Sequence, residues 1–492
     1  MLSKSKTKKS GKAEKESDVS KLVQLIEELK LVPGKDSLIA VVQYGSRKER
    51  IPLDSKDFRE YLLVAYHDLY EDCPSTQDIA NAVTVVKVHW EGKQKADLSY
   101  RINMVEDSIL IDLHDEELRY VKVSPDGWEV RSGGDEFFIS GANQKPQAIP
   151  VESEDGIYRL KKYLNLPEDQ MFLFMVTAVS CLNPQIQVPI LCFLGERGTG
   201  KSAMLEILSE LIDPNQVQKQ NLDAISDRDF GLSLSEAYFT SFDNVSKISR
   251  SKSDHLCQAV TGGVQAFRKL YTDGEQCVFD LNCRVAISSI EDCIKAEDLA
   301  ERTLYFDAQH ISKSKRMDEI NFWKSFRQDK PYILGHMVEL LSVALEIYPK
   351  VKRLLKHRHR IASFDEFGCA VAMALEQQDG MDLFTSLMDQ NAHRQLRISN
   401  EDITFLQSVN DFMDIDTTPH FESAMMEFYE TMDLFIEDCE AGEYADVKLG
   451  SYDAFTKRIR RLVPYAEQVG LKIEISRRSK DNVSYVAIDK IA

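Results

Sequence analysis

The sequence lacks the features of a fibre, a membrane span or a secretory leader. Its 492 residues include only 14 prolines and 22 glycines, which excludes a collagen-like or low-complexity chain. No uncharged apolar run reaches the roughly 18 residues that cross a bilayer. The lysines near the start precede no apolar stretch, so we expect no secretory signal. These absences predict a soluble, cytoplasmic protein with no membrane contact and about three domains.

The cysteine content is not unusual for a chain of this length. The nine cysteines form no Cys-x-x-Cys pair, and Cys192 and Cys283 lie in apolar, strand-like runs where a free thiol behaves as a small hydrophobe. We therefore expect no disulfide framework. The densest histidine cluster, His357 to Arg360, has no acidic or cysteine neighbours at metal-ligand spacing, so we expect no zinc site there.

Positive charge is scarce and unevenly placed. The chain has 61 Lys+Arg against 80 Asp+Glu, a net charge of −19. Residues 401–446 contain 14 acidic residues and no Lys or Arg, whereas residues 447–492 contain ten basic and five acidic residues. The first sixteen residues add six lysines and two glutamates. This distribution keeps nucleic-acid binding open despite the acidic total.

The acidic block at 401–446 has two interpretations. It is expected to be a solvated, partly helical linker. The alternative is an acidic segment that occupies a basic DNA-binding surface until DNA displaces it.

Apolar periodicity divides the rest of the chain. It predicts helices at 19–30 and 58–70 and a strand at 38–44. Short alternating runs between 83 and 130, separated by turn residues, predict a small β-rich domain. From about Gly156 strands and helices alternate, which is typical of a parallel α/β sheet, and residues beyond 317 are mostly helical in pattern.

A glycine-rich motif follows the apolar run 188–194, which predicts a strand buried on both faces. The next eight residues match G-x-x-x-x-G-K-[ST] and are the expected nucleotide-binding residues: Gly195, Glu196, Arg197, Gly198, Thr199, Gly200, Lys201 and Ser202. In this motif backbone N–H groups surround phosphates at a helix N-terminus. Lys201 is expected to reach the β- and γ-phosphates of ATP, and Ser202 to ligate Mg²⁺. A tight glycine turn without a nucleotide is the alternative.

A second motif lies about forty residues downstream. Asp243 ends the apolar strand 239–242, where a Walker B aspartate holds Mg²⁺. The next residue is Asn244 instead of a catalytic glutamate. An amide orients water but cannot accept its proton, so the group that activates water is left open.

Taken together, these motifs resemble the AAA+ ATPases of phages and mobile genetic elements, which are relatives of superfamily 3 and MCM-like replicative helicases. The resemblance also includes Asp243-Asn-Val-Ser, Thr261-Gly-Gly, Asp298-Leu-Ala-Glu-Arg302 and the C-terminal module. It implies that the Asp-Asn pair is the family's own Walker B form.

The resemblance assigns roles to further residues. Ser288 falls at sensor 1, where most relatives have asparagine. Arg302 falls where an arginine finger reaches the neighbouring subunit in a ring, and a surface salt bridge is its alternative role. The segment 268–282 resembles a pore hairpin, with an acidic tip and with Lys269 as the candidate DNA contact.

The C-terminal residues predict a basic amphipathic helix at 452–463 and a hairpin at 471–488. This pattern is typical of a winged helix, whose helix enters a groove while its wing contacts phosphates. The alternative is a packing or protein-binding module. The expected DNA contacts here are Lys457, Arg458, Arg461, Arg477, Arg478 and Lys480.

The predicted fold class is α/β, with an AAA+ core, a β-rich N-terminal domain, a helical lid and a C-terminal winged helix. The predicted segments are 1–18 (basic tail), 19–150 (N-terminal α+β domain), 151–315 (ATPase core), 316–400 (lid), 401–446 (acidic linker) and 447–492 (winged helix).

The expected function is an ATP- and Mg²⁺-dependent DNA helicase or translocase. It would act as a ring-shaped homo-oligomer, a hexamer, on single-stranded or forked DNA during replication of a phage or mobile element. One alternative is an ATP-driven switch or assembly ATPase, for example in antiphage defence, that recruits a protein effector. A third is an ATP-binding structural protein without turnover, because Asn244 and Ser288 depart from the usual pattern.

Overall fold

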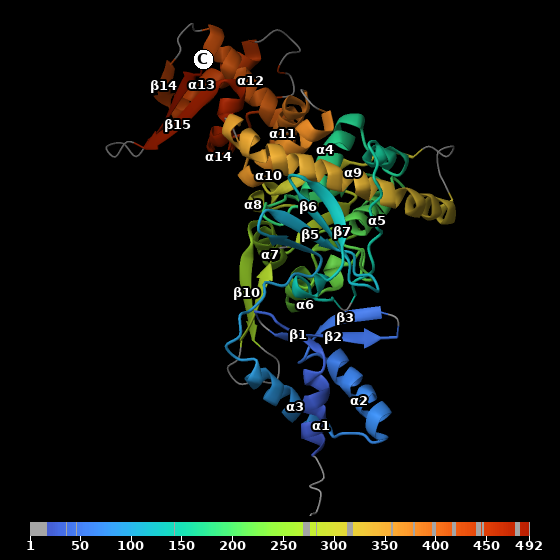
Figure 1. Ribbon diagram of the computed structural model, residues 1–492. Coiled ribbons are helices and arrows are strands. Elements are labelled where there is room, and N and C mark those ends of the chain that lie inside the picture. Colours follow the sequence, from blue (N-terminus) through green and yellow to red (C-terminus); the bar gives the residue numbers. More distant parts are fainter. Residues whose placement is uncertain are drawn as a thin grey trace, which may run out of the picture. The chain divides into compact units, whose positions relative to one another are not determined.

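The computed structural model divides the chain into two compact units, residues 1–389 and 390–492 (Figure 1). It describes residues 17–35, 37–45, 47–141, 143–268, 276–281, 283–311, 318–355, 358–376, 379–395, 400–415, 420–438, 444, 447–477 and 483–491.

The first unit begins with a small α/β part that has its own hydrophobic core. Its elements are α1 (Asp18–Glu27), β1 (Lys30–Pro33), β2 (Leu38–Tyr44), β3 (Arg47–Pro52), α2 (Lys56–Tyr70) and α3 (Thr76–His89). The strands form an antiparallel sheet in the order β1-β2-β3. A serine N-cap begins each helix: Ser17, Ser55 and Ser75 each accept a backbone N–H in the first turn.

The helix α3 corrects the predicted start of the β-rich region at residue 83. Its valines favour a strand by propensity. However, Ile79, Val83 and Val86 are buried at helical spacing, and Ser75 and Asp78 form a capping box. The strands begin only at Ile102, where β4 (Ile102–Val105), β5 (Ser108–Asp112), β6 (Tyr120–Ser124) and β7 (Gly127–Arg131) form an antiparallel meander.

The meander belongs to the large core and not to a separate N-terminal domain, so the predicted boundary at residue 150 is wrong. Ile109, Val121 and Val123 lie in the same buried cluster as the central sheet. Ser342 donates from α9 (Glu319–Leu354) to the carbonyl of Ser124 at 2.6 Å, and the Trp128 indole donates to Glu339 at 3.0 Å. The meander is held in the large core by its packing against α9. No local sequence pattern reveals this contact.

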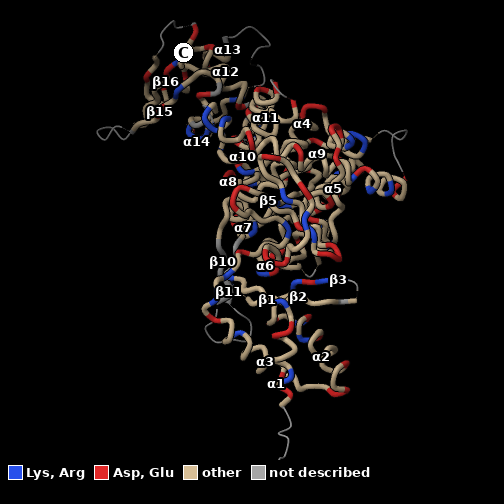
Figure 2. Tube along the Cα trace, in the orientation of Figure 1, with Lys and Arg blue, Asp and Glu red and all other residues tan. Residues whose placement is uncertain are grey.

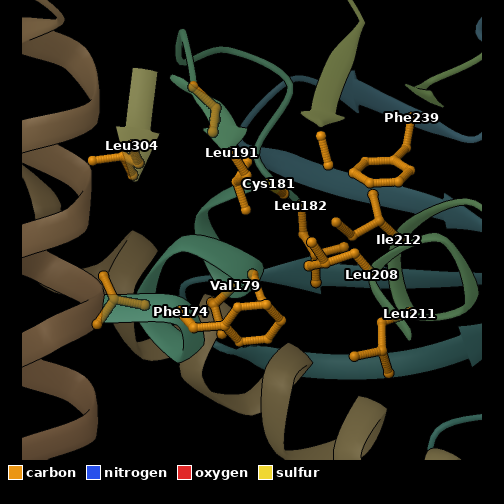
Figure 3. Packing of buried hydrophobic residues seen from close by; sticks show 14 of the residues in the cluster. Phe174, Val179, Cys181, Leu182, Leu191, Leu208, Leu211, Ile212, Phe239 and Leu304 are labelled. Atoms are coloured by element: carbon orange, nitrogen blue, oxygen red, sulfur yellow. The ribbon is translucent and has the colours of Figure 1, made fainter. Parts of the chain in front are cut away.

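The central sheet has four parallel strands in the order β13-β8-β12-β9. They are β8 (Ile190–Leu194), β9 (Phe239–Phe242), β12 (Arg284–Ser289) and β13 (Thr303–Asp307). Their residues are almost all buried, which confirms the strand expected at 188–194. Figure 3 shows Leu191 and Leu304 of this sheet in the core with Leu208 and Ile212 of α5 (Lys201–Ile212).

Helices complete the first unit. They are α4 (Glu168–Ser180), α6 (Asp227–Ser235), α7 (Arg250–Thr261), α8 (Glu297–Ala300), α9, α10 (Ala362–Glu376) and the first ten residues of α11 (Gly380–Gln395). All residues of α4 from Met171 to Ser180 are buried, as expected for a helix that is apolar on every side. Between α7 and β12, the strands β10 (Gly263–Arg268) and β11 (Gln276–Leu281) pair as a hairpin, but its first strand ends at Arg268, where the prediction had it begin.

The second unit overturns the prediction of an acidic linker at 401–446. Its elements are α12 (Asn400–Ile415), β14 (His420–Ala424), α13 (Met425–Asp438), α14 (Tyr452–Leu462), β15 (Leu471–Arg477) and β16 (Ser484–Lys490). The strand β14 pairs with β16, and Phe405, Phe428 and Phe455 share one core. Among the described residues, Glu427, Glu430, Asp433 and Glu437 are exposed on α13, whose apolar face is buried, whereas Asp402 of α12 is buried (Figure 2).

Candidate functional site

The glycine-rich loop joins the buried strand β8 to α5 at the carboxyl edge of the parallel sheet, where ligands bind in open α/β folds. The φ angles of Gly195, Gly198 and Gly200 are +150°, +79° and +87°. A Cβ on Gly195 would lie 2.7 Å from the carbonyl oxygen of Ala308. Glycine is therefore required by both conformation and space at Gly195.

The backbone N–H groups of this loop are available to a ligand. Apart from the turn at residues 197–198, the N–H groups of residues 196–203 make no hydrogen bond to another protein group within the described chain. Residues 201–203 also form the first turn of α5, where the helix dipole favours an anion. The loop thus fits a phosphate group.

Lys201 is held over the same loop. Its Nζ donates to the carbonyls of Gly195 at 2.6 Å and Glu196 at 2.8 Å. Burial lowers the pKa of Lys201, and the charge of Asp243 opposes that shift. The influence of Asp243 on Lys201 indicates that the loop and the end of β9 belong to one site.

The predicted residues Asp243, Asn244 and Ser288 come together at the ends of β9 and β12. The Ser288 hydroxyl donates to Oδ1 of Asp243 and accepts the backbone N–H of Asn244 at 2.9 Å. Asn244 has a φ of +54°, a left-handed conformation that asparagine tolerates better than most residues. Ser288 is fully buried, whereas Asp243 is half-buried and Asn244 exposed.

The donor set fits a hydrated Mg²⁺. Oδ2 of Asp243 has no protein partner among the described residues, and the Ser202 side chain is exposed at the first turn of α5. Carboxylate and hydroxyl oxygens, completed by water and phosphate, are what Mg²⁺ prefers. The residues present are therefore compatible with a nucleotide and its metal.

Arg302 is engaged in an ion pair. Its guanidinium bonds the Asp298 carboxylate and, at 2.6 Å, the Asp298 carbonyl, and its side chain is only 11 % exposed. The Arg302 contact lowers the pKa of Asp298. The more exposed Arg360 lies 3.5 Å from both Asp298 and Glu301. Two arginines therefore converge on one acidic edge of the unit.

The expected DNA contacts of the second unit have different environments. Lys457 is exposed on α14, and Arg461 is 58 % exposed although it binds Asp402 at 2.7 Å. Arg477 lies at the end of β15. Lys269, Arg478 and Lys480 lie outside the described residues.

The prediction for Arg458 needs correction. Its side chain is only 10 % exposed, its Nε lies 2.6 Å from Asp402, and its guanidinium stacks 4.5 Å from the Phe405 ring. Arg458 therefore joins α14 to α12. The amphipathic pattern placed it on the polar side but could not show that another helix covers that side.

Sequence reasoning missed Asp213, which binds the start of β9, the strand that leads to Asp243. Its Oδ2 accepts the N–H groups of Tyr238 at 3.0 Å and Phe239 at 3.3 Å, at the start of β9. Its Oδ1 accepts Nε of the fully buried Arg101 at 2.9 Å. The carboxylate thus connects the end of α5, β9 and the meander. No local motif marks a partner 112 residues away.

Residues 155–383, just under half of the chain, match a family model described as actinomycete integrative conjugative element replication protein. No curated protein matches. Solved apo structures of the NrS-1 C-terminal region are similar at low identity. One has 13 % identity and a TM-score of 0.46, and another has 12 % and 0.44; each covers 97 % of this chain and 100 % of its own.

The family match is consistent with a protein of mobile-element replication. Among the described helices, none has the length and the apolar character needed to cross a bilayer.

Proposed function

We propose that this chain is an ATP- and Mg²⁺-dependent AAA+ ATPase that acts as a DNA helicase or translocase in the replication of a mobile genetic element. The observation that carries the proposal is that the glycine loop, Lys201, Asp243 and Ser288 lie together at the carboxyl edge of the parallel sheet. The family match over 155–383 supports the replication role.

Each residue at this edge has a distinct task in the proposal. The free N–H groups of the loop bind phosphate oxygens, and Lys201 turns its ammonium from the loop carbonyls toward the β- and γ-phosphates. Ser202 and Asp243 hold Mg²⁺, which supplies charge neutralisation on those phosphates. Ser288 fixes the carboxylate of Asp243 and the backbone of Asn244, so the Asn244 amide is positioned to orient water.

The second unit supplies the proposed DNA-binding module. We extend the winged helix to residues 400–490, because α12, β14 and α13 share a core and a sheet with the basic helix and hairpin. Lys457 and Arg461 on α14 remain its candidate DNA contacts, and Arg458 does not. A ring-shaped homo-oligomer places Arg302 in a neighbour's site.

One observation favours the alternative of an ATP-driven switch that recruits a protein effector. The exposed face of α13 carries Glu427, Glu430, Asp433 and Glu437 around the exposed Leu434, a mixed acidic and apolar face. Such a face repels DNA and suits a protein with basic and apolar groups.

The deciding experiment is ATP turnover with and without forked DNA. We expect turnover that DNA stimulates several-fold and that Lys201→Ala reduces to background. Turnover that is indifferent to DNA would contradict the helicase proposal and favour the effector switch. A chain that binds ATP without any turnover would support the third, structural role.

A further inference from the structure

A groove of about 580 Å³ lies within the N-terminal α/β part, formed by residues 33–95. The end of β1, the start of β2, α2 and α3 form its walls, and the segment after α3 closes one side. That segment is fixed, because the N–H of Ala96 donates to the carbonyl of Pro33 at 2.7 Å. The groove is therefore built into the fold of this part.

Basic residues concentrate at this groove. Residues 17–95 contain 11 Lys+Arg and 13 Asp+Glu, so this part has no basic surplus overall. Five of the basic residues line the groove, against only two acidic ones, Asp54 and Glu91. The basic residues are Lys35, Arg59, Lys87, Lys93 and Lys95.

Three of these cations have no carboxylate partner among the described residues. Lys87 pairs with Asp54 at 2.8 Å and Lys35 with Asp97 at 2.7 Å. In contrast, Arg59 donates only to the carbonyls of Ser55 and Asp54, and Lys95 Nζ to the carbonyl of Lys35. The ammonium of Lys93 lies 3.6 Å from the centre of the Trp90 ring. Arg59, Lys93 and Lys95 therefore leave uncompensated positive charge.

The floor of the groove is apolar. Leu38, Leu53 and Ile79 line it from the buried side, and Val88 is 59 % exposed. The indole of Trp90 is half-buried beside Lys93. An apolar surface with an aromatic ring, bordered by cations that have no carboxylate partner, is the combination that binds single-stranded nucleic acid, because bases stack while phosphates meet the cations.

We infer that this groove binds single-stranded DNA, with phosphates at Arg59, Lys93 and Lys95 and bases over the apolar floor beside Trp90. The inference rests on the proposed function for the identity of the polyanion as DNA. An acidic peptide matches the charges but offers no flat rings to the floor, so DNA is the favoured occupant.

The test is fluorescence anisotropy of a labelled dT 20-mer with the full chain at several salt concentrations. The groove variant is Lys93→Ala/Lys95→Ala. The matched control is Lys48→Ala/Lys56→Ala, which removes two exposed lysines of the same part outside the groove. We expect the groove variant to raise Kd at least tenfold. We also expect the slope of log K against log salt to become about 1.4 less steep, because each phosphate contact with a single strand contributes about 0.7 to that slope and the variant removes two. The control should change Kd less than twofold, and thermal melting checks folding.

A second variant, Trp90→Leu, keeps apolar bulk but removes the ring, and we expect it to weaken dT binding with the salt slope unchanged. Equal Kd values for the groove variant and its control would overturn the inference. If forked DNA still stimulates turnover in that case, the proposed function stands. A wild-type chain that neither binds dT nor responds to forked DNA would overturn both. Loss of poly-glutamate binding with dT binding intact would make the groove an acidic-peptide site.

Discussion

At the scale of single residues, Ser288 is expected to be a positioning residue for the metal-binding carboxylate. Its hydroxyl bonds Asp243 and the backbone of Asn244, and nothing else near it replaces that donor among the described hydrogen bonds. We expect Ser288→Ala to reduce turnover about 10- to 100-fold, as loss of support behind a metal ligand does. It should also raise the Mg²⁺ concentration needed for half-maximal turnover.

Ser289→Ala is the matched control for that change. Ser289 lies on the same strand and is equally buried, but its hydroxyl bonds the carbonyl of Val245 at 2.6 Å and not Asp243. A loss of stability should therefore appear in both variants. An unchanged Mg²⁺ requirement in Ser288→Ala would contradict the positioning role.

A second prediction at this scale concerns the fully buried pair of Arg50 and Asp112. Burial alone would raise the pKa of Asp112, but Arg50 and the hydrogen bond with His114 lower it to about 2. Because the pKa of the folded state lies below the ordinary 3.8, the stabilisation is present above about pH 4 and is lost as pH falls toward 2. The shift corresponds to about 2 kcal/mol of unfolding free energy.

Calorimetry from pH 5 to pH 2.5 measures this acid sensitivity in the melting of the first unit. We expect Asp112→Asn to melt earlier at pH 5, because it leaves the Arg50 charge buried without a counter-ion. Its melting temperature should also fall less steeply with acid than that of the wild type. The same dependence of melting temperature on pH in the variant and the wild type would contradict the prediction and show that other carboxylates determine the acid sensitivity.

At the scale of secondary-structure elements, local sequence patterns predict a helix, strand or turn correctly where residues close in sequence determine its conformation. The strands at 38–44 and 188–194, the helix at 452–463 and the glycine-rich turn all follow from periodicity and spacing. Local patterns fail where packing against a segment distant in sequence determines the structure. The acidic residues of α12 obscure its apolar face in the sequence pattern. Phe405, Leu406 and Val409 of that face belong to the core of the second unit, and Phe405 packs on Phe455, fifty residues away on α14.

Asp402 provides the test at this scale. It is buried, 7 % exposed, and binds both Arg458 and Arg461 from α12. We expect Asp402→Ala to destabilise the second unit by about 3 kcal/mol, since removing the carboxylate leaves a nearly buried guanidinium without its counter-charge. Asp414→Ala, which breaks the exposed pair with Lys490, should cost less than about 1 kcal/mol. Amide hydrogen exchange in α12 and α14 measures the loss of stability in each variant. Equal losses in Asp402→Ala and Asp414→Ala would contradict the structural role of Asp402.

At the scale of the whole molecule, the candidate site is the part most predictable from sequence, because a loop motif contains its own geometry. Support from elsewhere was not predictable, because Asp213 and Arg101 lie on chain segments that pack together only in the folded state. The ion pair of Arg302 with Asp298 is local, four residues apart, and matches the salt bridge left open as the alternative role of Arg302. In the proposed ring this ion pair matters for assembly, because Arg302 would have to leave Asp298 to reach a neighbouring subunit.

Subunit mixing tests whether Arg302 acts between subunits. Lys201→Ala and Arg302→Ala proteins should each be inactive, but a ring made from equal amounts of both contains sites with Lys201 from one subunit and Arg302 from its neighbour. Random assembly of a head-to-tail ring restores about a quarter of the sites. We therefore expect turnover of about a quarter of the wild-type value after mixing, provided both variants melt normally. No recovery at any mixing ratio would place Arg302 in its own subunit, where its bond to Asp298 is a structural contact.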